Sequence, residues 1–253
     1  MLKFGPGGVG TPAEDGLDEI SKADLKAAEI EFVRQIYMDN NRAKEVGDYA
    51  KKLGIVLSIH APYYINLNSD DPKKVSASRS RILKCVERGH YMGAKYVVFH
   101  PGYYGKMSHE VTYENIKKQI IKIMDEIKKQ GWKCEIAAET TGKINVFGSL
   151  DEVLKLYSDT GCYFCVDFAH LRARGLGKIN YDEVFKKLKS YKKLHCHFSG
   201  IEWSDKGERK HVVTPKDWML ELIKYLKKNK KEAVIINESP DCLNDSIKMM
   251  KLV

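Results

Sequence analysis

The sequence lacks any segment that would span a membrane or direct export. No apolar run approaches the roughly 20 residues of a membrane-spanning helix. The opening MLKFGPGGVG has no charged region followed by a long apolar one, as a secretory signal would. Linkers, low-complexity tracts and closely spaced repeats are missing too. We therefore expect a cytoplasmic protein with no membrane partner and no obligate protein partner.

Cysteine pairs that could form a structural zinc site or a redox motif are almost absent. Among the six cysteines, only Cys162 and Cys165 have CxxC spacing. Both are expected on one strand, where residues three apart point to opposite faces. The pair is therefore rejected as a shared metal or redox site, and buried reduced thiols are expected.

Acidic residues are fewer than basic ones. Lys and Arg number 43 against 34 Asp and Glu, which gives a net charge of +9. This excess favours anionic partners such as nucleic acid. Much of it lies in lysine-rich helical stretches, residues 117–130 and 224–233, which are more typical of solvated outer faces. The charge permits DNA binding without establishing it.

Strand-like and helix-like segments alternate along the whole chain. Eight strands are predicted at residues 2–5, 28–34, 55–60, 96–100, 134–139, 163–168, 194–198 and 233–238. Helical patterns lie between them, as at 41–54, 71–93, 149–159 and 215–228, with a capping box of Ser149 and Glu152 and with Thr214 as the N-cap before Pro215. Apolar strands separated by helices favour a parallel sheet covered on both sides. The 253 residues also match the ~250 of an eight-stranded barrel. The predicted fold is α/β, a single (β/α)8 TIM barrel domain of residues 1–253; a doubly wound open sheet is the alternative.

Six of the strand-like runs stop at, or within a residue of, a side chain that binds metals: His60, His100, Glu139, Asp167, His197 and Glu238. Buried strands rarely end this way, because an unpaired polar group must be desolvated. In a parallel barrel these ends meet at one mouth, the usual place of the active site. We therefore expect a metal site at the carboxyl-terminal ends of the strands.

Further histidines extend this set. His170 and His211 are candidate ligands, His195 is expected to be structural or to support the ligands, and His90 and His109 are expected at the surface. Imidazole and carboxylate without thiolate suit Zn²⁺, Mn²⁺ or Fe²⁺. Eight or nine ligands exceed the need of one ion, so two or three ions are predicted.

The segments that carry these residues resemble the endonuclease IV family of apurinic/apyrimidinic endonucleases, above all its shorter archaeal members, within the xylose-isomerase-like TIM barrels. They are HAPYYINL (60–67), FHPG (99–102), ETTG (139–142), CVDFAH (165–170), HFSG (197–200) and NES (237–239). The resemblance runs from the second strand to the last. It implies a TIM barrel whose trinuclear zinc site hydrolyses the phosphodiester 5′ to an abasic site in double-stranded DNA, during base-excision repair.

The resemblance also implies a role for each residue. His60, His100 and Glu139 would hold a first zinc ion, and Glu139 would bridge to a second that Asp167, His197 and Glu238 complete. His170 would bind the third, and Glu139 would orient the attacking hydroxide as the catalytic carboxylate. The family's third-metal pair is Asp-x-His, whereas the segment KGERKHV places Glu208 and His211 three apart. We expect His211 and Glu208 as ligands; alternatively Arg209 or Lys210 occupies a ligand's place, and the third site is weak or absent.

Loops at the strand ends are predicted to contact DNA. Tyr63 and Tyr64 match the position where the family inserts bulky side chains into the bent duplex. Arg34, Tyr104 and Arg172 are further candidates, with Tyr103, Lys106 and Arg174 beside them. Ordinary exposed loops are the alternative interpretation of these residues.

Two rival functions remain. A sugar isomerase or epimerase of the xylose-isomerase-like barrels would also gather Glu, Asp and His around one or two ions. A barrel that binds damaged nucleic acid without cutting it would need a disabled third metal site. His170, His211, the paired tyrosines and the positive charge favour the nuclease.

Overall fold

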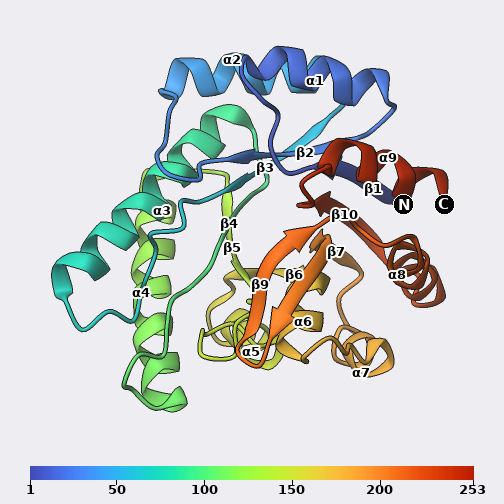
Figure 1. Cartoon of the computed structure of the whole chain (residues 1–253). Helices are drawn as coiled ribbons and strands as arrows, with labels where there is room; N and C mark the ends of the chain where they lie inside the picture. The colour runs from blue at the N-terminus through green and yellow to red at the C-terminus, as the bar shows by residue number, and fades with distance from the viewer.

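The computed structural model describes residues 1–253 and contains an eight-stranded sheet that curves into a barrel (Figure 1). Neighbouring strands follow the order β1-β10-β7-β6-β5-β4-β3-β2, and every pair is parallel. This confirms the predicted (β/α)8 barrel. The strands are β1 (Leu2–Pro6), β2 (Ala27–Glu31), β3 (Val56–His60), β4 (Tyr96–Phe99), β5 (Glu135–Glu139), β6 (Tyr163–Asp167), β7 (Lys193–Phe198) and β10 (Glu232–Asn237).

The seam between β1 and β2 closes the ring. Gly7 and Glu29 form an isolated parallel bridge, and the N–H of Gly8 donates to the carbonyl oxygen of Glu29 at 2.9 Å. The two backbones touch at Gly5, where an added Cβ would lie only 1.6 Å from the carbonyl oxygen of Ala27. Glycine is therefore required at this point of the seam.

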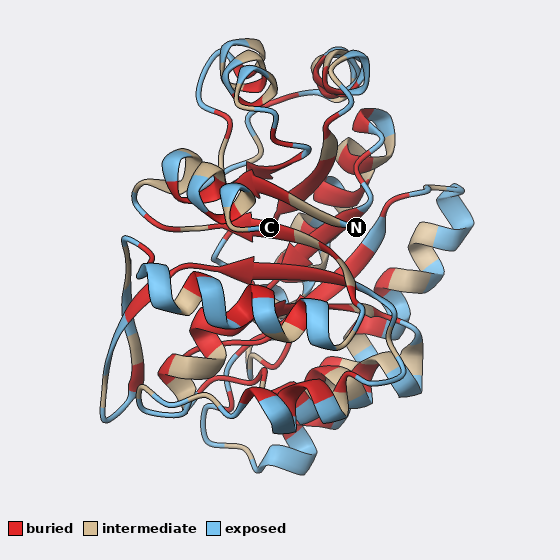
Figure 2. Ribbon diagram, turned by 90° about the vertical axis from the view of Figure 1, so that its right-hand side faces the viewer, coloured by how far each residue is buried: buried red, intermediate tan, exposed pale blue.

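Helices surround the barrel, and their apolar faces pack against the strands. Figure 2 shows the strands almost entirely buried, while each helix is buried on one side and exposed on the other. One cluster of 56 buried apolar residues fills this layer, so barrel and helices share a core. None of these helices combines the length and the hydropathy that a membrane-spanning segment needs. The helices are α1 (Ala13–Lys22), α2 (Asn40–Lys52), α3 (Pro72–Met92), α4 (His109–Gln130), α5 (Leu150–Thr160), α6 (Phe168–Arg174), α7 (Tyr181–Lys187), α8 (Lys216–Lys228) and α9 (Cys242–Lys251).

Local signals account for several helix ends. The predicted capping box is present: the Ser149 side chain accepts from the N–H of Glu152, whose own side chain accepts from the N–H of Ser149. The predicted N-cap at Thr214 is one residue off, because Pro215 occupies that position. Thr214 is used elsewhere, since its N–H donates to Asp245 and its hydroxyl oxygen accepts from Asn237.

Other differences from the sequence expectations matter for the site. β2 ends at Glu31, so Arg34 lies beyond the strand in a bend. Cys162 lies just before β6, and both Cys162 and Cys165 are buried free thiols. An unpredicted antiparallel hairpin, β8 (Gly200–Ser204) and β9 (Gly207–Val212), follows β7 and contains the segment KGERKHV. It is drawn in orange in Figure 1.

Candidate metal centre

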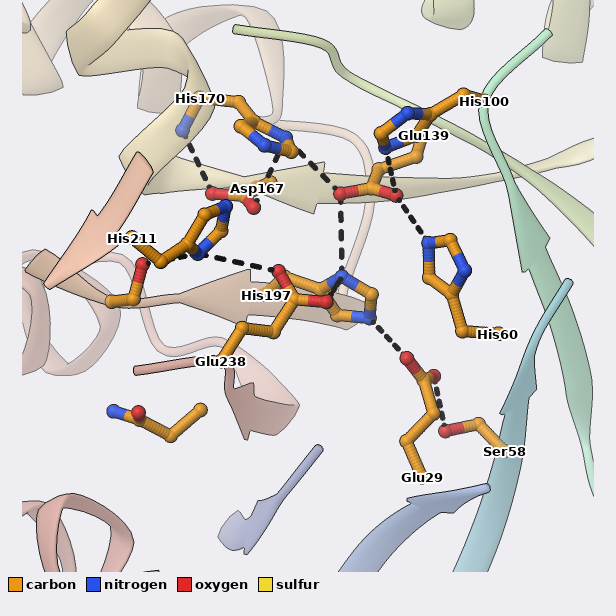
Figure 3. Close-up of polar contacts among 12 residues, drawn as sticks. Glu29, Ser58, His60, His100, Glu139, Asp167, His170, His197, His211 and Glu238 are labelled. Atoms are coloured by element: carbon orange, nitrogen blue, oxygen red, sulfur yellow. Dashed lines mark hydrogen bonds and ion pairs between the residues drawn. The ribbon is translucent and has the colours of Figure 1, made fainter. Parts of the chain in front are cut away.

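Glu139 lies at the centre of the carboxyl-terminal mouth of the barrel, and four histidines surround its carboxylate (Figure 3). Its Oε2 lies 3.1 Å from Nε2 of His60 and 3.0 Å from Nε2 of His100. Its Oε1 lies 3.2 Å from Nδ1 of His170 and 3.3 Å from Nδ1 of His197. Because Glu139 is fully buried, water does not compete for these contacts.

The first ligand group consists of His60, His100 and Glu139, whose ligand atoms all lie within 4.8 Å of one another. His60 is oriented by its Nδ1, which lies 2.8 Å from the carbonyl oxygen of Ala61. A proton on Nδ1 leaves the lone pair of Nε2 directed at Glu139. Backbone carbonyls commonly orient metal-binding histidines in this way.

The second ligand group shares Glu139 with the first and adds Asp167, His197 and Glu238. Nδ1 of His197 lies 3.2 Å from Oε1 of Glu238. Asp167 ends β6 and caps α6, since its Oδ1 accepts from the N–H of His170 at 2.8 Å. The cap fixes the carboxylate and leaves Oδ2 buried without a hydrogen bond.

The third ligand group consists of Asp167, His170 and His211. Nδ1 of His170 lies 2.9 Å from the carbonyl oxygen of Thr140, which leaves Nε2 free. Nδ1 of His211 is held by the hydroxyl of Ser199 at 2.8 Å. The two rings stand perpendicular with centroids 5.3 Å apart, so a face of the hairpin meets α6 here.

The pairing of β8 with β9 shows which way the side chains of the segment KGERKHV point. Glu202 pairs with Lys210 and Trp203 with Glu208, so Arg209 is an extra residue in a β-bulge. Beyond the bulge Glu208 still faces the site, with Oε2 3.5 Å from Nε2 of His170. Arg209 and Lys210 are exposed, which argues against the alternative that either replaces a ligand.

The donor atoms fit bound divalent ions. Glu139 Oε1, Asp167 Oδ2 and Nδ1 of His197 are buried without a hydrogen bond, which is costly unless a cation satisfies them. The separations of 3.0 to 3.3 Å between Glu139 and the nitrogens of His60, His100 and His197 are near the ~3.3 Å between neighbouring ligands of a tetrahedral zinc with bonds of about 2.0–2.1 Å. A set of nitrogen and oxygen donors suits Zn²⁺ and also Mn²⁺ or Fe²⁺.

Glu29, which was not among the residues predicted for the site, lies beneath the ligand groups on the inner face of β2. Its Oε1 lies 2.9 Å from Nε2 of His197, and its Oε2 accepts from the hydroxyl of Ser58 at 2.6 Å. Burial alone would raise the pKa of Glu29, but the neighbouring His197 and His195 hold that pKa well below its usual value. The signal was the alternation Glu29-Ile30-Glu31 inside an apolar run, which puts both carboxylates on one face of the strand.

Glu31 is the second missed carboxylate. It lies two residues further along the same face, and its Oε1 is buried without a hydrogen-bond partner. Burial raises the pKa of Glu31 to about 8, against the opposing effect of His60. Gly7 leaves room for it, since a Cβ there would lie 3.2 Å from Oε1 of Glu31.

Three of the residues predicted to contact DNA are exposed near the mouth. Tyr63 is 53% exposed, and its ring centroid lies 5.7 Å from that of His60. Tyr64 is 61% exposed, and Arg34 is exposed as well. These side chains are free to meet a large substrate over the metal centre.

Two of the predicted DNA contacts are placed elsewhere. Tyr104 is buried, because its hydroxyl donates to Glu152 at 2.7 Å and its ring stacks on that of His109. The Arg172 guanidinium lies 4.1 Å from the centroid of the Trp218 ring and 3.1 Å from Oε2 of Glu221. Both side chains make these contacts within the fold in this structure, and their contact with DNA stays a prediction.

The remaining histidines lie where the sequence suggested. His90 accepts from the N–H of Lys133, and the side chain of His109 is 67% exposed. His195 is buried with Nε2 3.4 Å from Oε2 of Glu29, so it supports that carboxylate.

Two relatives cover most of the chain. Uncharacterized protein MJ0133 of Methanocaldococcus jannaschii is 39% identical over 266 residues, 99% of this chain and 96% of the relative. Probable endonuclease 4 of Mycoplasma mobile is 29% identical over 212 residues, 79% of this chain and 68% of the relative. The chain is thus similar along most of its length to a protein named as a probable endonuclease.

Solved structures of two different enzyme classes share the fold equally well. Endonuclease IV from Thermus thermophilus has a TM-score of 0.69 at 17% identity, covering 99% of this chain and 97% of that one. D-psicose 3-epimerase from Clostridium cellulolyticum also has a TM-score of 0.69, at 13% identity, covering 98% of this chain and 88% of that one. The profile of one family spans both the barrel and the metal centre, matching residues 17–250. By this match and by its fold, the chain belongs to the Xylose isomerase-like TIM barrel family.

Proposed function

We propose that this protein is a metal-dependent endonuclease that hydrolyses the phosphodiester 5′ to an abasic site in double-stranded DNA, as a step of base-excision repair. The observation that carries the proposal is the presence of three overlapping ligand groups in one mouth, joined through Glu139 and Asp167. Shared carboxylates place ions close together, and clusters of that kind suit displacement at phosphorus. The similarity to Probable endonuclease 4 supports the same reaction class.

The chain's own residues would divide the work. His60 and His100 would hold the first ion, His197 and Glu238 the second, and His170 and His211 the third, with Glu208 beside them. Bound divalent ions, most naturally two or three Zn²⁺, supply charge stabilisation at the phosphate and lower the pKa of water toward neutrality. Glu139, which faces two ligand groups, would orient the attacking water.

The exposed aromatic side chains would hold the damaged duplex. Tyr63 lies beside the first ligand group and Tyr64 follows it at the rim, where a bulky side chain can fill the space of an extruded nucleotide. Arg34 would contact a phosphate. The excess of 43 basic over 34 acidic residues would assist the approach of DNA.

A sugar isomerase or epimerase is the second candidate. The second ligand group, Glu139, Asp167, His197 and Glu238, would serve a single ion in such an enzyme. The third group favours the nuclease, because a one-ion sugar site has no use for His170 and His211. A protein that binds damaged DNA without cutting it would gain little from so many buried carboxylates near a phosphate.

The test is incision of a duplex oligonucleotide that carries one abasic-site analogue, with an undamaged duplex as control. Metal content of the same preparation is measured by elemental analysis. Cutting only 5′ to the lesion with two or three ions per chain supports the proposal. Absence of cutting by a metal-loaded protein overturns it, and epimerisation of a ketohexose by that preparation would establish the rival.

A further inference from the structure

We infer that Glu29 is a positioning residue of the metal centre, which holds the imidazole of His197 so that Nδ1 faces the second ligand group. The inference rests on the metal centre of the proposed function but not on its DNA substrate. It concerns a carboxylate on β2, a strand that contributes no residue to the three ligand groups described above, although Glu29 and Glu31 form a further group with Glu238.

The two nitrogens of His197 face opposite sides. Nδ1 points to the ligand group, 3.3 Å from Oε1 of Glu139 and 3.2 Å from Oε1 of Glu238. Nε2 points to the barrel interior, 2.9 Å from Oε1 of Glu29 (Figure 3). His197 is fully buried, so no water can take the place of Glu29 at Nε2.

Glu29 is itself held from two neighbouring strands. The hydroxyl of Ser58 on β3 donates to its Oε2 at 2.6 Å, and Nε2 of His195 on β7 lies 3.4 Å from the same atom. Glu29 is fully buried, and Ser58 and His195 are each 3% exposed. These contacts fix the orientation of the carboxylate, so that Oε1 faces Nε2 of His197.

This arrangement has a consequence for metal affinity. A carboxylate on the far nitrogen of a metal-binding histidine fixes the tautomer and the ring orientation and strengthens the ligand. Without Glu29, Nε2 of His197 would be buried without its carboxylate partner, and the ring would lose the contact that sets its angle. The affinity for the ion held by His197 would fall first. His60 and His170 would keep their own contacts with the carbonyl oxygens of Ala61 and Thr140, so the ions at those histidines would be less affected.

The experiment compares binding of Co²⁺ to the metal-free full chain as wild type, Glu29→Gln, Ser58→Ala and Glu31→Gln. Visible absorption of Co²⁺ reports the geometry of each site, and chelator competition gives each affinity. Glu29→Gln should weaken one ion by about 10- to 100-fold and shift its absorption. Ser58→Ala should do so less, because Glu29 remains. Glu31→Gln is the matched control, since it changes a carboxyl group on the same face of β2 whose Oε1 makes no hydrogen bond.

The outcomes are distinct. Unchanged binding and an unchanged spectrum in Glu29→Gln would overturn the inference. So would an equal weakening of every ion together with a lower melting temperature of the metal-free chain, because a purely structural role predicts that result. An equal effect of Glu31→Gln would overturn the specific role of Glu29, because any change of a carboxyl group on this face of β2 would then disturb the site. If wild type bound no Co²⁺ at all, the metal centre and the proposed function would both fall.

Discussion

Glu208 and His170 face each other across the third ligand group, with Oε2 of Glu208 3.5 Å from Nε2 of His170. Glu208 also shares a face of the hairpin with His211, although the two are three residues apart on β9. The bulge at Arg209 makes this possible, because residues three apart on a regular strand point to opposite faces. The bulge absorbs the one residue by which KGERKHV exceeds an acidic-x-His pattern.

Deletion of Arg209 should therefore be tolerated by the third site. The shortened strand would have Glu208 and His211 two positions apart on a regular ladder, where they again share a face. We expect the deletion variant to retain the metal content of wild type by elemental analysis. Loss of one ion on deletion would mean that Arg209 itself takes part in the site.

The matched variant for that deletion is Glu208→Gln, which keeps the bulge and removes the charge. We expect it to weaken the third ion selectively, by about 10-fold or more, since a neutral amide is a poorer partner for a cation. Chelator competition measures the affinity of each variant for the third ion. The Arg209 deletion tests the position of Glu208, and Glu208→Gln tests its charge. Full affinity in Glu208→Gln would show that the third group relies on Asp167, His170 and His211 alone.

Substitution of Glu139 should have the largest effect on activity. Glu139→Ala removes a ligand from two groups at once. We expect incision of abasic-site DNA to fall by at least about 1,000-fold, which corresponds to about 4 kcal/mol of transition-state stabilisation. Metal content should fall by more than one ion per chain. Retention of all ions with full activity would remove Glu139 from the centre of the mechanism.

The aromatic side chains should separate into DNA contacts and structural ones. Tyr63→Ala should weaken binding of abasic-site duplex by about 1–3 kcal/mol, the usual value of one base–aromatic stack, without changing metal content. Tyr104→Phe should leave DNA binding intact and lower the free energy of unfolding by about 1 kcal/mol, because it loses the hydrogen bond to Glu152. Fluorescence anisotropy and denaturant unfolding measure the two effects, and the reverse result would return Tyr104 to the DNA surface.

Asp245 should account for part of the loss of folding stability at low pH. Burial opposes ionisation, but Lys248 and the N–H of Thr214 lower the pKa of Asp245 below its usual value. A lowered folded-state pKa gives stability that is present above the unfolded value, about 3.9, and is lost as the pH falls through the folded value. Asp245→Asn should therefore flatten the loss of stability below about pH 4. It should also cost about 1–3 kcal/mol at neutral pH. Urea unfolding over a pH series tests both, and an unchanged acid limb would exclude Asp245 as its source.

The sequence was sufficient for the barrel and for the strand ends. β3, β5 and β6 end at His60, Glu139 and Asp167, because a polar metal ligand interrupts a run of apolar residues at the point where the strand meets the mouth. His100 and Glu238 follow the last strand residue, and His197 is one residue short of it. The spacing and length of the apolar runs therefore predicted which side chains would meet at the mouth, although not the distances between them.

The sequence could not show how deep inside the barrel a polar side chain lies. Glu29 is one polar residue inside a strand pattern, and only the closed barrel shows that it lies beneath His197 rather than at the mouth. The hairpin was not predicted, because β8 and β9 are mostly polar and do not form apolar runs like those of the barrel strands. The contacts of Tyr104 and Arg172 within the fold were not predicted for a related reason, since they depend on partners such as Glu152 and Trp218 that are distant in sequence.

The seam between β1 and β2 gives the barrel a line along which it can open. Every other pair of neighbouring strands is joined by a ladder, whereas this pair has one isolated bridge at Gly7 and Glu29 and a backbone hydrogen bond from Lys26 to Phe4. Local unfolding follows the weakest backbone contacts. Amide protons along this line should exchange with deuterium before those of β5, β6 and β7. The first opening of the ring would thus occur beside Glu29, with the strands that hold Glu139 and Asp167 still paired.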